Sequence, residues 1–143
     1  MDNGDDTESE GRPLLSTGQL AAATGVSSRT IRYYEELGIL PPPPRTAGGT
    51  RRYPTEYRFY VEGALALKEI GFNLDEIRVI GRLALGGPLS AREREDAHDI
   101  LRRKGRVLER RIRVLNLLRD VLSQSDAPPA GYSDVIEAAR DLA

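Results

Sequence analysis

The feature that most constrains this chain is a proline-free run from Ser90 to about Ser123 whose apolar residues recur every seven positions. Such spacing is typical of a helix that buries one stripe against another helix, and this run would be about 50 Å long at ~1.5 Å per residue. No other segment is long enough to cover the stripe, so we expect a second copy of the chain to cover it. The predicted dimerisation residues are Ile100, Leu101, Val107, Leu108, Ile112, Val114, Leu115, Leu118, Val121 and Leu122.

Two basic residues interrupt this stripe. Lys104 and Arg111 stand where a strict seam would carry apolar side chains, which makes the predicted packing partial. Gly105 either allows a partner helix to approach closely or weakens the helix. The imperfect seam leaves open an alternative, a protein-interaction module whose long helix pairs with a different partner protein.

A pair of short helices is predicted at about residues 18–37. Ser16 and Gln19 have the spacing of a capping box, so the first helix begins there. Gly25 suits a turn that needs a positive φ, and Ser27 can cap the second helix by accepting from a backbone N–H. Two short helices joined by a glycine turn form a helix-turn-helix.

A small hairpin is predicted at about residues 44–53, directly after a run of four prolines. Gly48 and Gly49 make its tip permissive, as a tight β-turn requires. Two more helices should follow, one with Pro54 in its first turn and one started by a capping box at Asn73. These helices would pack behind the hairpin, which is then the wing of a winged helix-turn-helix.

The predicted fold class is therefore mainly α, with four short helices and a small β-hairpin wing followed by a long coiled-coil dimerisation helix. A winged helix-turn-helix domain is placed at residues 14–86 and the long helix at 89–124. Residues 1–13 are predicted to be a disordered acidic tail, because they offer too little apolar surface to offset the entropy of ordering. Residues 125–143 are predicted to be a short tail with a helical turn.

Positive charge gathers in one part of a chain whose formal net charge is only −1. Residues 29–58 carry six arginines against three glutamates. Arg29 and Arg32 lie one helical turn apart in this stretch, and Ser28 and Thr30 add hydrogen-bond donors. One helix thus offers both charge and hydrogen bonds to a polyanion.

Composition excludes several classes of protein. With no cysteine and one histidine, the chain has no disulfide, no thiolate metal site and no Ser-His-Asp set, and we predict that it is not an enzyme. Asp96, His98 and Asp99 are interpreted as solvated groups, so neither a metal nor a cofactor is assigned. The acidic start and the lack of a long apolar run favour a cytoplasmic protein without membrane contact.

Three motifs together resemble the MerR family of transcription regulators. The first is Val-Ser-x-x-Thr-Ile-Arg-Tyr-Tyr-Glu at residues 26–35, and a Gly-x-Leu-Pro-Pro turn begins at Gly38. The third is Gly-Phe-x-Leu-x-Glu-Ile at residues 71–77. The resemblance runs from about Leu15 to Ile80.

The resemblance implies a homodimer linked by antiparallel long helices. It would bind a pseudo-palindromic operator in double-stranded promoter DNA and distort it so that RNA polymerase can engage, which also places it with the nucleoid. The implied DNA contacts come from the second helix, the wing and, at a phosphate, Lys68. Together with neighbouring donors, the candidate DNA-binding residues are Ser28, Arg29, Thr30, Arg32, Tyr33, Tyr34, Arg45, Thr50, Arg51, Arg52, Tyr53 and Lys68.

Some of these assignments have alternatives. Tyr33 and Tyr34 are adjacent in a helix and cannot both face DNA, and Tyr33 could equally lie in the core. Thr50 stands where the family usually has an aromatic residue, which removes one expected contact. Nineteen of the chain's 21 basic residues are arginines, so a single arginine can also be an ordinary surface group. The motifs favour Arg32 and Arg51 as functional; Arg45, Arg52 and Arg58 stay open.

The sequence leaves the regulatory signal undefined. Family members that sense metals or oxidants generally use cysteines near the end of the long helix, and this chain has none. A small-molecule effector held near the long helix and the tail, or no effector at all, are both compatible with the sequence, as are activation and repression.

Overall fold

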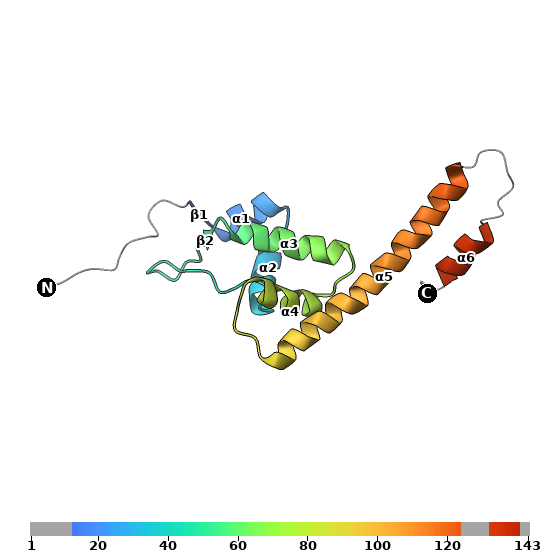
Figure 1. Cartoon of the computed structure of the whole chain (residues 1–143). Helices are drawn as coiled ribbons and strands as arrows, with labels where there is room; N and C mark the ends of the chain where they lie inside the picture. Colours follow the sequence, from blue (N-terminus) through green and yellow to red (C-terminus); the bar gives the residue numbers. More distant parts are fainter. Residues whose placement is uncertain (1–12, 124–131, 141–143) are drawn as a thin grey trace. The chain divides into compact units, whose positions relative to one another are not determined.

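The computed structural model of the chain describes residues 13–123 and 132–140 (Figure 1). Except for Pro13, the predicted acidic tail lies outside the described residues. Within them the fold is mainly helical with one small sheet, which confirms the predicted fold class. The elements are β1 (Leu14–Leu15), α1 (Thr17–Thr24), α2 (Ser28–Glu36), β2 (Tyr53–Pro54), α3 (Tyr57–Glu69), α4 (Leu74–Ala84), α5 (Ala91–Ser123) and α6 (Tyr132–Arg140).

The chain forms two compact units, Met1–Ser90 and Ala91–Ala143. In the first, α1 packs on α2 and α3, and α3 packs on α4. The core side chains come from all four helices and from the segments between them. Six side chains are almost fully buried: Leu20, Ile31, Leu40, Tyr53, Val61 and Ile77.

Local capping begins α1, α2 and α4 as the sequence predicts. Ser16 and Gln19 form a complete capping box at α1, and Gly25 ends this helix in the left-handed conformation with φ of 72°. Ser27 caps α2 by accepting from the backbone N–H of Thr30 at 3.1 Å. A second capping box begins α4 at Asn73. These interactions satisfy N–H groups that the first helical turn leaves without intrahelical partners.

The small sheet was not predicted. β1 pairs antiparallel with β2, with Leu15 opposite Tyr53 and Leu14 opposite Pro54. The prediction that Pro54 lies in a first helical turn is therefore wrong, because the strand pairing holds it before α3 begins at Tyr57. Two-residue strands carry no readable alternation, so only their pairing across the chain reveals them.

The wing occupies the stretch between α2 and β2. It is closed by a single isolated bridge between Arg45 and Arg51. Gly49, at its tip, has φ of 83°, and Arg52 donates a backbone bond to Pro44 at 2.8 Å. The wing is a hairpin with little regular ladder, and its conformation depends on other contacts.

In the second unit, α6 packs along α5. Val135 of α6 is buried. Much of the apolar stripe of α5 is nevertheless exposed, with exposed fractions of 56% at Ile112, 64% at Leu115 and 80% at Leu122. No helix among the described residues is both long and apolar enough to cross a membrane.

Candidate nucleic-acid interface

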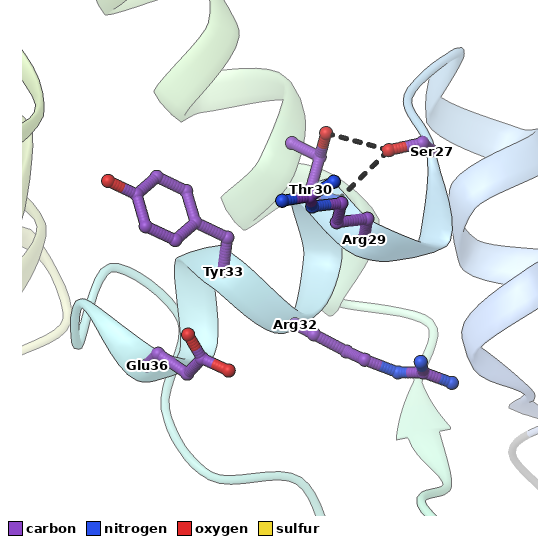
Figure 2. A pocket seen from close by; sticks show the side chains of 6 residues that line it. All are labelled: Ser27, Arg29, Thr30, Arg32, Tyr33 and Glu36. Carbon is purple, nitrogen blue, oxygen red and sulfur yellow. Dashed lines mark hydrogen bonds between the residues drawn. The ribbon is translucent and has the colours of Figure 1, made fainter.

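The outward face of α2 forms an open hollow of about 690 Å³ on the surface of the first unit (Figure 2). The helix turns its apolar positions inward, with Ile31 fully buried, and leaves polar side chains outside. This is the arrangement expected of an amphipathic helix. The hollow is lined by Ser27, Arg29, Thr30, Arg32, Tyr33 and Glu36.

Charge and hydrogen-bond donors are available on this face. Arg29 and Arg32 are exposed, and in the described part of the chain neither forms an ion pair. The hydroxyl of Thr30 is committed locally, since it lies 3.0 Å from that of Ser27 in the helix cap. Ser28, also predicted to contact DNA, is half-buried at the start of α2. The two arginines are therefore the strongest candidates on the helix to bind an anion.

The two adjacent tyrosines have opposite environments. Tyr33 is 47% exposed and lies in the hollow, whereas Tyr34 is only 2% exposed. Burial raises the pKa of the Tyr34 phenol. The expectation that Tyr34 contacts DNA is therefore corrected: it lies three residues after the buried Ile31, on the same inner side of the helix. Of the two tyrosines, Tyr33 is the one that lies on the outer face of α2.

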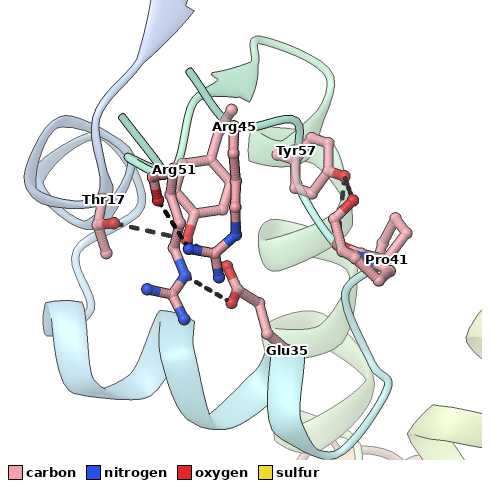
Figure 3. A network of polar contacts seen from close by, with 9 residues as sticks. Thr17, Glu35, Pro41, Arg45, Arg51 and Tyr57 are labelled. Atoms are coloured by element: carbon pink, nitrogen blue, oxygen red, sulfur yellow. Dashed lines mark hydrogen bonds and ion pairs between the residues drawn. The ribbon is translucent and has the colours of Figure 1, made fainter. Parts of the chain in front are cut away.

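A polar network joins the wing to α2 (Figure 3). Arg51 of the wing donates from Nε to Glu35 Oε2 at 2.9 Å, and the Tyr53 hydroxyl donates to Glu35 Oε1. The Thr17 hydroxyl of α1 lies 3.5 Å from that of Tyr53. Burial, followed by the hydrogen bond with Glu35, raises the pKa of Tyr53. Three segments distant in sequence thus meet in one network, and two side chains of the same segment, Arg51 and Tyr53, bind the Glu35 carboxylate.

The network changes the role of Tyr53. Its side chain is fully buried, so the expected contact between Tyr53 and DNA is corrected to an internal contact with Glu35. Arg51 keeps part of its side chain at the surface, with 31% exposed. The sequence identified Glu35 as the last residue of the first motif and as a negative charge, but not as part of the site, because nothing in its immediate neighbourhood identifies its partners.

The other wing residues differ in their exposure and in their hydrogen bonds. Arg45 is exposed, but its Nη1 donates to the carbonyl of Gly49 at 2.8 Å and so braces the wing tip. Thr50 is exposed, and Arg52 is partly exposed. These side chains lie on the same hairpin as Arg51, beside the end of α2 that carries Glu35.

Lys68 lies apart from the hollow, exposed in the last turn of α3. A positive charge there also interacts favourably with the helix dipole, so its position has a structural reason as well. Near it, α3 and α4 border an apolar hollow of about 450 Å³. Only apolar residues, glycines and Tyr60 line that hollow, so it is not part of the charged surface.

Across residues 13–123 and 132–140, no three His, Cys, Asp or Glu side chains are grouped in a way that could hold a metal ion. Asp99 lies beside Arg102, whose hydrogen bond lowers the pKa of that carboxyl. His98, next to it, is exposed.

A helix-turn-helix with arginines on its outer face and a wing tied beside it defines a winged-helix protein of the kind that binds nucleic acid. Residues 16–53 match the model of the MerR family regulatory protein, and residues 64–124 match the model described as MerR, DNA binding. The chain belongs to the MerR family, whose members are transcription regulators. This confirms the resemblance seen in its motifs.

Individual relatives agree with this assignment. The nodulation protein NolA of Bradyrhizobium elkanii is 40% identical over 105 residues, which are 73% of this chain and 43% of NolA. The HTH-type transcriptional regulator ZntR homolog of Haemophilus influenzae is 29% identical over 119 residues, which are 80% of this chain and 88% of that protein. The match thus spans less than half of the length of NolA.

The fold is also that of a solved structure, HiNmlR, a MerR family regulator lacking the sensor domain, bound to promoter DNA. The TM-score is 0.51 at 22% identity, and the match covers 85% of this chain and 99% of that one.

Proposed function

We propose that this chain is a sequence-specific transcription regulator that binds a promoter operator as a homodimer and distorts the DNA to control transcription. The observation that carries the proposal is the outer face of α2, where Arg29, Arg32 and Tyr33 are exposed beside a wing that is tied to the same helix. The family, and a related regulator bound to promoter DNA, support it. The chain acts by binding and not by catalysis, in the cytoplasm and on the nucleoid.

In this mechanism α2 enters the major groove as a recognition helix. Arg29 and Arg32 bind base edges or phosphates, and Ser28 and Thr30 add short-range donors near the helix N-terminus. Arg45, Thr50, Arg51 and Arg52 approach the neighbouring backbone from the wing, and Lys68 contacts a phosphate. Each phosphate that is neutralised releases counterions, so the affinity falls as salt rises.

The long helix supplies the second half of the proposal. Exposed apolar side chains at Ile112, Leu115 and Leu122 would be buried against the same stripe of a second copy. A two-fold dimer presents two recognition helices, which fits a pseudo-palindromic operator. RNA polymerase would engage the distorted promoter.

Fluorescence anisotropy tests the DNA-binding part. The protein is titrated into labelled DNA from upstream of its own gene and into a scrambled duplex, at two salt concentrations. We expect preference for the upstream DNA, and a loss of about tenfold or more in affinity for Arg32→Ala. Arg113→Ala removes the same charge from α5 and should bind as the wild type does. Equal binding of both duplexes at both salts would contradict the proposal.

Light scattering tests the dimer. We expect the mass of a dimer for the wild type and of a monomer for Leu115→Glu, because a carboxylate would then be buried in the apolar seam. Asn116→Glu is the matched control, since the next residue points about 100° further round the helix. A monomeric wild type would favour the alternative, a module that pairs with a different protein.

A further inference from the structure

Glu35 is placed where a carboxylate is unexpected. It lies on α2, and the arginines of this helix are the proposed contacts to a polyanion. A free carboxylate there would repel DNA phosphates. Its side chain is only 10% exposed, however, and each of its oxygens accepts a hydrogen bond, one from Arg51 and one from Tyr53.

The bond from Arg51 leaves part of its guanidinium available. Arginine has five N–H donors, and the bond from Arg51 to Glu35 uses the one on Nε. The four donors on Nη1 and Nη2 are the paired set that binds a phosphate in a two-point fork. The Arg51 side chain is 31% exposed, so this fork can reach solvent while Nε stays on Glu35.

Arg51 and Tyr53 reach the same carboxylate because they are two residues apart in an extended segment and point to the same side. Tyr53 is fully buried and fixed in the core, where it also meets the Thr17 hydroxyl of α1. The wing beyond this point has only one isolated bridge. In the described residues, the side-chain hydrogen bonds that join this segment to α2 both end on Glu35, so we expect the orientation of the wing on α2 to depend on that carboxylate.

We propose that Glu35 is a positioning residue that clamps the wing to α2 and turns the Nη groups of Arg51 towards a DNA phosphate. The inference rests on the proposed function, since it assigns the origin of the wing contact. Glu35 acts through Arg51 and does not touch DNA. Its negative charge contributes to binding a polyanion because it orients a cation.

This inference predicts an effect opposite in sign to simple electrostatics. Glu35→Gln keeps the size of the side chain but removes its charge, and on charge alone it should tighten DNA binding. The clamp predicts about tenfold weaker binding and a salt slope smaller by about 1, as for a lost phosphate contact. Glu36→Gln removes the same charge one residue on, from an exposed side chain in the hollow on the outer face of α2, and should bind more tightly, as charge alone predicts.

A double-mutant cycle separates positioning from general damage. If Glu35 acts through Arg51, Glu35→Gln should change affinity less than about twofold in a protein that already carries Arg51→Ala. A variant that merely unfolds the domain would weaken both backgrounds alike. Binding of Glu35→Gln as tight as, or tighter than, the wild type overturns the proposal.

Hydrogen exchange of the free protein tests the clamp without DNA. The wing amides of Thr46, Gly49 and Arg52 are hydrogen-bonded within the hairpin and should exchange several-fold faster in Glu35→Gln. Amides within α4 should not change, which shows that the domain is folded. If the wing amides exchange at the same rate in Glu35→Gln as in the wild type, the clamp is overturned, whether or not the protein binds DNA. If the wild type binds no DNA, that result by itself contradicts only the proposed function.

Discussion

The two units of this chain differ in how far their large apolar side chains are buried. In the first, side chains such as Leu20, Ile31 and Ile77 are at most 1% exposed. On α5, Leu115 and Leu122 are 64% and 80% exposed. The first unit has a well-buried core, although Phe59 at its apolar hollow is 71% exposed, whereas much of the stripe on α5 still has surface to bury. Stability of the first should therefore be a property of one chain, and that of the second a property of an assembly.

The largest expected effect tests this difference with one substitution at two places. Ile31 is fully buried and Ile112 is 56% exposed. We expect Ile31→Ala to lower the free energy of unfolding by about 2–5 kcal/mol through lost burial and a residual cavity. Ile112→Ala should cost much less, and its cost should depend on protein concentration. Urea unfolding followed by tyrosine fluorescence, at two protein concentrations, measures both.

If Ile31→Ala and Ile112→Ala lowered the free energy of unfolding equally and at any protein concentration, the proposed difference between the units would be contradicted. The α5 stripe would then be as well buried within one chain as the core is. Leu20→Ala provides a second core position and should behave like Ile31→Ala.

Smaller changes in stability are expected when two glycines are replaced by alanine, a loss at one and a gain at the other. Gly25 ends α1 with φ of 72°, where a Cβ is strained, although no atom lies within 4 Å of it. Gly25→Ala should cost about 1–2 kcal/mol. Gly105 lies inside α5 in open space, and Gly105→Ala should stabilise the helix by up to about 1 kcal/mol. Thermal unfolding measures both.

The Gly105→Ala variant also distinguishes the two roles that the sequence allows for this glycine, close approach of a partner helix or weakening of the helix. If Gly105→Ala weakens the dimer in light scattering, the glycine is there for close approach of the partner helix. A stabilised dimer of unchanged mass would show that it merely weakens the helix.

The smallest effect concerns alkaline pH. Burial raises the pKa of Tyr57 from its ordinary 10 to about 12, and its hydroxyl donates to the carbonyls of Pro41 and Pro42 at 3.2 Å each. The unfolded chain loses this proton first, so the contribution is intact below about pH 10 and is lost as the pH rises towards 12. We expect Tm to fall by a few degrees between pH 9 and pH 11. The loss should be smaller in Tyr57→Phe, which has no phenol to ionise.

The loss of stability at alkaline pH should be confined to the first unit, which holds all the tyrosines except Tyr132. Light scattering at both pH values should show an unchanged mass, because the proposed dimer seam consists mainly of apolar side chains that do not ionise. A dissociating dimer at pH 11 would contradict that separation.

Much of the fold could be predicted because it depends on neighbours in sequence. The caps at Ser16, Ser27 and Asn73 and the turn at Gly25 all follow from groups within four residues of one another. The heptad stripe likewise predicted the long helix. The exposed arginines of α2 were predicted by their motif, and their contact with DNA stays a prediction.

What the sequence by itself determined is thus the four short helices of the first unit and the long helix, the capped starts of α1, α2 and α4, and the polar character of one face of α2. Only the tertiary structure decided that Tyr33 lies outside and Tyr34 inside, that β1 pairs with β2, and that Glu35 holds Arg51 and Tyr53. The reason is physical: helix caps are bonds between near neighbours, whose geometry the local residues dictate. The contacts of Glu35 join residues 16 and 18 positions apart, and they form only when packing of the core brings the wing to α2.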